Sequence, residues 1–210
     1  MWFHVDGAYG GLASALPSIK HKYAGLERAD SIALDFHKWL YQPFEIGCVL
    51  VQDWEKMRET YYKEADYLTT ELQTNANTRL EFNEHYFQLS RNAKAFKVWL
   101  SVKTYGFDRI RDMIQKDIDL TNYLIKLVEE STDFELKSKA DLAVACFRFK
   151  GKLTDNEAIS DLNQKLIPAL EADGRVFITS TKLNGEFVLR ACIINHRKTE
   201  TSIEYLLDTI

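Results

Sequence analysis

Long apolar runs, paired cysteines and a strong excess of one charge are all missing from this 210-residue sequence. No apolar stretch reaches the roughly eighteen residues that a membrane-spanning helix requires, and no signal-peptide pattern opens the chain. The net charge of −4 gives no reason to expect nucleic acid or an anionic membrane as a partner. These absences lead us to expect a cytoplasmic protein.

Cysteine is scarce: the sequence contains only Cys48, Cys146 and Cys192. Each lies in an apolar, strand-like stretch, and their spacing is not paired. An odd number of such cysteines predicts buried thiols in a reducing compartment and argues against disulfide bridges or a zinc site. A hydrophobic content of 46% and a charged content of 28% are typical of a soluble globular protein with an ordinary core.

The pair His37-Lys38 follows an apolar segment and is the most informative feature that the sequence contains. Earlier in the chain, another apolar segment ends at Asp6. Pyridoxal phosphate (PLP) needs both kinds of side chain. A lysine amine holds its aldehyde as a Schiff base, and a carboxylate keeps its pyridine nitrogen protonated so that the ring accepts electrons. The two residues, in this order, predict a PLP enzyme.

Each of these residues also has an ordinary structural interpretation. A lysine after a strand is usually a solvated surface residue, and Asp6 is placed to cap a helix that follows it. His37 alone fits a core histidine, whereas beside a Schiff-base lysine it would contact the cofactor phosphate or the substrate. Ala8, two residues after Asp6, is expected on the same side of an extended chain, where a small side chain lets a flat ring lie against the backbone.

Arg190 is a charged residue inside the apolar strand predicted at residues 187–192. A charge in such a strand must be paired. Its partner is either a carboxylate of the substrate or a carboxylate of the protein in a structural ion pair, and the sequence leaves both alternatives open.

Short apolar segments separated by crossovers predict an α/β fold for the first part of the chain. Strands are expected at residues 2–5, 31–34 and 46–51. In parallel or mixed sheets, ligands bind beyond the carboxyl ends of the strands, which is where Asp6 and Lys38 fall. Because the first segment already has the character of a buried strand, we expect the strands before it to be missing and the chain to be truncated.

The second part of the chain has a different pattern, which predicts a small α+β domain. Polar residues 69–84 come before it and are interpreted either as a mobile loop or as a plain surface connection. A helix from residue 89 to Gly106 ends the first part, and a long helix to about Glu130 joins the two parts. The predicted elements of the second part are a strand at 142–149, a helix from a capping box at Thr154 to Gly174 that Pro168 kinks or restarts, a hairpin around Asn184-Gly185, and a helix from Thr201. We therefore expect domains at 1–105 and 106–210.

Residues 4–11 (HVDGAYGG), 29–40 (ADSIALDFHKWL) and 89–99 (LSRNAKAFKVW) resemble the group II PLP-dependent amino-acid decarboxylases, and so do 187–190 and 195–199. This family includes aromatic-L-amino-acid, glutamate, histidine and diaminobutyrate decarboxylases. The likeness covers nearly the whole chain and is strongest to bacterial aromatic-amino-acid decarboxylases. It implies PLP fold type I, with the end of the large mixed-sheet domain followed by a small C-terminal α+β domain.

The resemblance also implies roles for particular residues. Lys38 would be the Schiff-base lysine, Asp6 the partner of the pyridine nitrogen, and Ala8 a contact on one face of the ring. His37 would lie near the phosphate and the lysine, and Arg190 matches an arginine that contacts the substrate in glutamate decarboxylases. The implied reaction is the decarboxylation of an L-amino acid to an amine and carbon dioxide, and the likeness favours an aromatic substrate.

The loop at 69–84 matches the family's mobile loop, which reaches the active site of the partner subunit, so the resemblance implies a homodimer for the full-length enzyme. The loop's catalytic tyrosine falls on Phe82 or nearby, or is served by Tyr86. The segments that hold most of the cofactor phosphate in the family come before this point, so the chain is alternatively an inactive fragment or half of a split enzyme. A cysteine desulfurase of the same fold type is the weaker rival, because it needs a reactive cysteine on a mobile loop.

Overall fold

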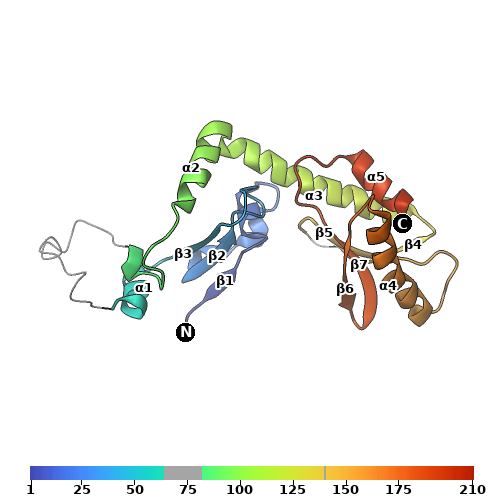
Figure 1. Ribbon diagram of the computed structural model, residues 1–210, viewed down its shortest axis with the longest axis horizontal. Helices are drawn as coiled ribbons and strands as arrows, with labels where there is room; N and C mark the ends of the chain where they lie inside the picture. The colour runs from blue at the N-terminus through green and yellow to red at the C-terminus, as the bar shows by residue number, and fades with distance from the viewer. Residues whose placement is uncertain (64–81, 140) are drawn as a thin grey trace, which may run out of the picture. The chain divides into compact units, whose positions relative to one another are not determined.

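A computed structural model describes residues 1–63, 82–139 and 141–210 of the chain. The chain divides into two compact units, Met1–Leu12 with Lys20–Thr104 and Ala13–Ile19 with Tyr105–Ile210 (Figure 1). The segment Ala13–Ile19 therefore packs with the second unit, where the hydroxyl of Ser18 donates a hydrogen bond to Gln115 Oε1 at 2.7 Å. None of the helices among the described residues is long and apolar enough to cross a membrane.

The first unit is built on a three-stranded sheet in the order β1-β2-β3 (Figure 1). Its strands are β1 (His4–Asp6), β2 (Ser31–Asp35) and β3 (Gly47–Val51). β1 runs parallel to β2, and β2 runs antiparallel to β3. The predicted mixed sheet is confirmed, and the carboxyl ends of β1 and β2 meet at one edge of it.

Helical segments complete the described part of the first unit. Between β1 and β2 the chain forms three 3-10 turns, η1 (Gly11–Ala15), η2 (Lys20–Tyr23) and η3 (Leu26–Arg28). η1 runs from the first unit into the segment Ala13–Ile19 of the second unit. After β3 come α1 (Trp54–Tyr61), η5 (Phe82–Glu84) and α2 (Lys94–Tyr105). α2 begins five residues later than predicted, because residues 89–93 form bends and irregular backbone instead. The predicted loop at 69–84 lies outside the described residues except for η5.

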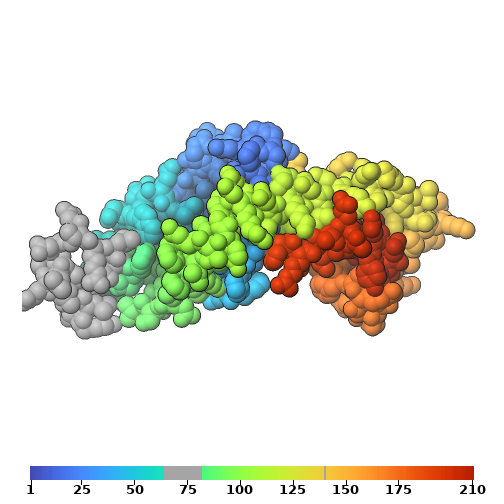
Figure 2. Space-filling model, turned by 90° about the horizontal axis from the view of Figure 1, so that it is seen from above, coloured from blue at the N-terminus to red at the C-terminus, as the bar shows by residue number. Residues whose placement is uncertain are grey.

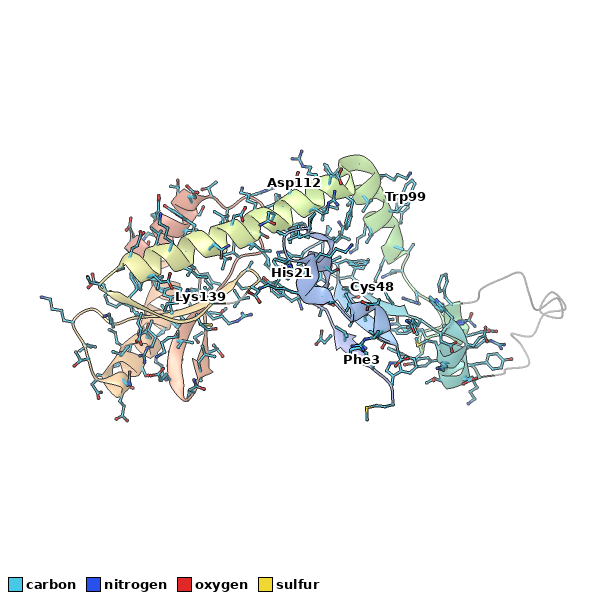
Figure 3. All side chains as sticks on the ribbon, turned by 180° about the vertical axis from the view of Figure 1, so that it is seen from behind. Phe3, His21, Cys48, Trp99, Asp112 and Lys139 are labelled. Carbon is cyan, nitrogen blue, oxygen red and sulfur yellow. The ribbon has the colours of Figure 1, made fainter. Side chains whose placement is uncertain are left out.

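Helix α2 turns its polar side chains toward its own unit and leaves its large apolar ones exposed. Lys94, Lys97 and Ser101 bond to the segment 42–45, at 2.6, 2.6 and 3.1 Å. Figure 2 shows α2 (green) at the surface, and Figure 3 labels Trp99 on it. The apolar side chains on α2 with large exposed fractions are Phe96 (61%), Trp99 (56%) and Leu100 (49%).

The second unit contains a four-stranded antiparallel sheet in the order β4-β5-β7-β6, packed with three helices (Figure 1). Figure 2 shows α5 (red) lying along α3. This arrangement agrees with the predicted α+β character. The elements are α3 (Phe107–Glu130), β4 (Phe134–Lys139), β5 (Val144–Phe149), α4 (Asn156–Asp173), β6 (Thr179–Leu183), β7 (Glu186–Cys192) and α5 (Glu200–Thr209).

The predicted apolar face of the long helix α3 forms much of the core of this unit. Ile110, Ile114, Ile118 and Ile125 recur at helical spacing, and all four are buried. The predicted hairpin is also confirmed. Asn184 and Gly185 connect β6 to β7 with φ angles of 51° and 86°, which is the left-handed pair that a two-residue hairpin turn requires.

The starts of α4 and α5 differ from the prediction, whereas the end of α4 agrees with it. α4 is capped by Asp155, whose carboxylate accepts the N–H of Ala158 at 2.8 Å, so the capping box predicted one residue earlier is wrong. α5 is capped by Thr199, two residues before the predicted cap. α4 continues through Pro168 and ends where predicted, at Gly174, which has a φ of 75°.

The second unit contains a charge network around Arg148. The Arg148 side chain is 1% exposed and pairs with Glu135 and with Glu186, whose Oε1 lies 3.4 Å from Nη1. Lys137 Nζ reaches the same two glutamates, at 3.2 and 2.6 Å. Burial alone would raise the pKa of Glu135, but hydrogen bonds from Arg148 and Lys137 outweigh it and hold this pKa below its ordinary value.

We expect Arg148→Ala to lower the free energy of unfolding by about 3–5 kcal/mol, because it leaves two glutamates without their buried partner. Urea denaturation followed by circular dichroism measures the loss. The control is Arg175→Ala: Arg175 pairs with Asp173, but its side chain is 56% exposed, so its loss should be below about 1 kcal/mol. Equal losses of unfolding free energy in the two variants would show that the buried Arg148 network stabilises the fold no more than an exposed ion pair does.

Tyr123 joins α3 to α5, since its hydroxyl donates to Glu204 Oε1 at 2.6 Å. This hydrogen bond, together with burial and the nearby carboxylate charges, raises the pKa of Tyr123 to about 12. The raised pKa stabilises the folded chain fully below the ordinary tyrosine pKa of about 10, and the contribution is lost as the pH rises through about 12.

In an absorbance titration, Glu204→Ala should lower the pKa of one phenol from its raised value toward the ordinary value of about 10. Tyr123→Phe identifies that phenol, and an unchanged titration in Glu204→Ala would refute the bond.

Candidate functional site

Asp6 is the last residue of β1, and the chain turns directly after it. Asp6 Oδ1 accepts the N–H of Ala8 at 3.0 Å, and the N–H of Gly11 closes the turn by donating to the carbonyl of Gly7 at 2.8 Å. Ala8 therefore belongs to a turn, and the expectation that it lies beside Asp6 on an extended strand is wrong. Asp6 is exposed, and among the described residues its Oδ2 has no hydrogen-bond partner.

The His37-Lys38 pair lies in the turn that follows β2. The N–H of Lys38 donates to the carbonyl of Asp35 at 3.0 Å, and Lys38 Nζ lies 2.8 Å from Asp35 Oδ2. The two side chains are 34% and 28% exposed, so the amine is within reach of solvent. Asp35 was not among the predicted site residues, and its spacing of three residues from Lys38 gives an ion pair only because the chain turns between them.

One backbone hydrogen bond joins the two turns. The N–H of Asp35 donates to the carbonyl of Ala8 at 3.1 Å. Because β1 and β2 are parallel, with Asp6 opposite Ala33, both turns leave the sheet at the same edge. The structure thus places Asp6, Ala8, His37 and Lys38 at one edge, while their chemical roles stay predictions.

The imidazole of His37 is held by the backbone of Ile46. His37 Nδ1 lies 3.2 Å from the nitrogen and 2.9 Å from the oxygen of Ile46. A protonated Nδ1 would leave the Ile46 N–H without an acceptor, whereas the Ile46 oxygen already accepts the N–H of Phe36 at 3.0 Å, so we assign Nδ1 as the acceptor for the Ile46 N–H. The proton then lies on Nε2, which is 3.7 Å from Asp35 Oδ2. This tautomer gives the site an N–H donor instead of a second acceptor.

Aromatic packing fixes the positions of both turns. Trp39 is fully buried, and its ring stacks on Tyr9 with centroids 4.5 Å apart. His37 stacks on Phe44 at 4.4 Å. Since Tyr9 follows Ala8 and Trp39 follows Lys38, the first stack links the two turns directly beside the residues of the site.

Arg190 lies on β7 of the second unit, opposite Cys146 on β5 and Thr179 on β6. Its side chain is half-buried, and no carboxylate of the described residues forms an ion pair with it. Arg148 on β5, in contrast, is paired with two glutamates. Within the described part of the chain, the structural ion pair that the sequence left open for Arg190 is therefore not formed.

Cys48 and Cys146 do not have the environment of a reactive thiol. Burial raises the pKa of Cys48, and it raises that of Cys146 in spite of the nearby positive charge of Arg190. A raised pKa disfavours the thiolate, which is the nucleophilic form. These two thiols therefore give no support to the cysteine desulfurase alternative.

Tyr86 and Phe82, the two positions considered for a loop tyrosine, lie among aromatic side chains of the first unit. Tyr86 packs against Phe87 with centroids 4.3 Å apart, and the guanidinium of Arg91 lies 4.6 Å from the Tyr86 ring centre. Phe82 is exposed and lies edge-on to Trp54 at 6.5 Å. The choice between them stays open.

Two parallel strands, one ending at Asp6 and the other followed by the turn that carries Lys38, define an α/β protein with a candidate site for an aldehyde cofactor. Residues 1–150 match the family described as the pyridoxal-dependent decarboxylase conserved domain, and the chain belongs to this family. The chain is 33% identical over 200 residues to an aromatic-L-amino-acid decarboxylase of Bacillus atrophaeus. It is 29% identical over 193 residues to tryptophan decarboxylase 2 of Oryza sativa subsp. japonica.

These alignments cover 95% and 92% of this chain, but only 42% and 39% of the two relatives. A solved structure of Oryza sativa TDC with PLP and tryptamine is similar at a TM-score of 0.92 and 25% identity. The match covers 99% of this chain and 43% of that one. The chain thus has the fold of PLP-dependent decarboxylases and spans less than half the length of these relatives.

Gly7 is tightly enclosed where the chain leaves β1. A Cβ at this position would lie 3.0 Å from the carbonyl oxygen of Ala33 and 3.2 Å from the Cα of Gly11, and neither backbone atom moves easily. We expect Gly7→Ala to lower the free energy of unfolding by about 1–3 kcal/mol, as overpacking does. Gly47→Ala is the control, because its Cβ would meet only Asp35 Oδ1, at an ordinary 3.5 Å. Urea denaturation compares the two, and equal stabilities would show that the turn is loose.

Proposed function

We propose that this chain carries the cofactor lysine of a PLP-dependent decarboxylase that converts an aromatic L-amino acid to its amine and carbon dioxide. The observation that carries the proposal is the common edge at which Asp6 and Lys38 lie, joined by the hydrogen bond between Asp35 and Ala8. The preference for aromatic substrates is supported by the names of the relatives, which are aromatic-L-amino-acid and tryptophan decarboxylases.

The donor set at this edge fits PLP. Lys38 offers an amine that solvent reaches, which is the group that an aldehyde requires. Asp6 offers a carboxylate with one oxygen bound to the N–H of Ala8 and the other uncommitted among the described residues, as a partner for a pyridinium N–H requires. When bound, PLP supplies the electron sink for the pair of electrons that carbon dioxide leaves behind.

Each residue of the edge then has a separate task. Lys38 would hold the cofactor through its amine, and Asp6 would keep the ring nitrogen protonated through a charge-assisted hydrogen bond. Ala8 presents a small side chain to the flat ring. The Nε2–H of His37 is a donor for the cofactor phosphate or for the substrate, because Nδ1 is occupied by the Ile46 N–H.

Arg190 is proposed to bind the carboxylate of the substrate. It is a half-buried cation without a carboxylate partner in the described part of the chain, so an incoming carboxylate would supply the pairing that its strand lacks. Arg190→Lys should weaken such a contact, because an ammonium cannot reproduce the two parallel hydrogen bonds of a guanidinium.

The whole enzyme extends beyond what this chain shows. We propose a homodimer in the cytoplasm with an amino acid as substrate. The placement of this segment at the end of the large domain, followed by the small C-terminal domain, is also a proposal, and the covered shares of the relatives do not support it. The alternative is a chain that is inactive alone, as a fragment or as half of a split enzyme.

Incubation with PLP followed by borohydride reduction tests the proposal. Reduction traps the lysine that holds the aldehyde, and mass spectrometry locates it. We expect close to one label per chain on Lys38, and no label in Lys38→Ala. Lys94→Ala removes another ion-paired lysine of the same unit and should keep the label.

The distribution of the label separates the alternatives. Label on Lys38 would show that this chain alone holds a competent lysine, and a screen of aromatic amino acids for released carbon dioxide would follow. A folded chain without label would favour the inactive fragment or the split half. Label spread evenly over the lysines would refute Lys38 as the cofactor residue.

A further inference from the structure

The carboxylate of Asp35 contacts the lysine on which the proposed function depends. Asp35 Oδ2 lies 2.8 Å from Lys38 Nζ, and the His37 Nε2 is 3.7 Å from the same oxygen. The backbone fixes this geometry from both sides. The N–H of Asp35 is bound to Ala8, and its carbonyl accepts the N–H of Lys38. The carboxylate therefore cannot leave the lysine without a change in its own rotamer or in that of Lys38.

An ion pair of this kind restrains the reaction that a cofactor lysine must perform. To bind an aldehyde, the ammonium first loses one proton to solvent. Its nitrogen then forms a C=N bond with the aldehyde carbon, and the aldehyde oxygen leaves as water. A carboxylate at 2.8 Å attracts the ammonium and so opposes the movement of the nitrogen away from it.

We propose that Asp35 is a positioning residue that holds the Lys38 amine paired, and slow to react, until the cofactor aldehyde takes it. In the absence of cofactor, the pair keeps a flexible lysine side chain in one place at the end of β2. The importance of this restraint for catalysis rests on the proposed function. The restraint itself is a property of the described residues and is measurable without any cofactor.

The same unit offers a matched comparison. Lys94 pairs with Glu45 at 2.6 Å, and the Lys94 and Lys38 side chains are 35% and 34% exposed. Lys103 on α2 is exposed and has no ion pair within the described part of the chain. These lysines show how a paired and an unpaired amine of this unit react under identical conditions.

The test is competitive reductive methylation with formaldehyde and cyanoborohydride, with the rate at each lysine read by mass spectrometry. Formaldehyde forms the same C=N bond, and cyanoborohydride supplies the hydride that converts it to a methylated amine. We expect Asp35→Asn to raise the methylation rate at Lys38 by about two- to fivefold, which corresponds to the loss of a partly exposed ion pair. Lys94 and Lys103 should keep their rates. Glu45→Gln should speed Lys94 and leave Lys38 unchanged.

The salt dependence of the methylation rate at Lys38 distinguishes an ion pair with Asp35 from a merely structural role of Asp35, because salt would not change the rate in the second case. Screening weakens a partly exposed ion pair, so the rate at Lys38 should rise with salt in the unmodified chain and in Asp35→Glu, relative to Lys103. It should not rise in Asp35→Asn. An unchanged or lower Lys38 rate in Asp35→Asn that keeps its circular dichroism spectrum would overturn the proposal. If Asp35→Asn does not fold, the unmodified chain decides. Methylation rates at Lys38 and Lys103 that change in parallel at every salt concentration would then overturn the proposal.

This outcome is separate from the outcome of PLP labelling. A restraint at Lys38 without PLP labelling would leave the role of Asp35 intact and the proposed function unsupported. Labelling of Lys38 without a restraint would support the function and remove Asp35 from it.

Discussion

The N–H of Asp35 donates to the carbonyl of Ala8, and the geometry of the site depends on this hydrogen bond. It joins the turn after β1 to the turn after β2, so the carboxylate of Asp6 and the amine of Lys38 are carried by one connected piece of backbone. Stacking of the buried Trp39 on Tyr9 supports the same junction. The short strands contribute little burial here, and the positions of the chemical groups follow from how the two turns lock together.

The two units treat charge in different ways. In the second unit, Arg148 is removed from solvent and compensated by Glu135 and Glu186, an arrangement that stabilises the sheet only while all partners are present. At the edge of the first unit, Asp6, Asp35 and Lys38 remain within reach of water, where ion pairs are weaker and exchangeable. Weak pairing would suit the exchange of partners that we propose for these residues when a ligand binds.

The sequence was sufficient to predict features that depend on local patterns. A carboxylate and a lysine after successive apolar segments had to reach the same edge once the strands were parallel, and Asn184-Gly185 could hardly be anything but a hairpin turn. Features set by competition between neighbours were missed. Asp155 caps α4 although its neighbour Thr154 also fits a capping pattern, and β4 alternates apolar and charged residues whose partners lie far along the chain. The pairing of Asp35 with Lys38 depends on the shape of a turn, which residue types alone do not reveal.

Helix α2 has a consequence for how the chain responds to denaturants and temperature. Its polar side chains are bonded to its own unit, while Phe96, Trp99 and Leu100 already face water in the folded state. Two quantities scale with the surface that unfolding newly exposes: the heat-capacity change of unfolding, and the slope with which the free energy of unfolding falls as urea is added. α2 therefore contributes little to either quantity. α3, with Ile114 and Leu124 fully buried, contributes much more. Salt weakens the contacts that hold α2, whereas α3 is held by apolar burial, which salt does not screen.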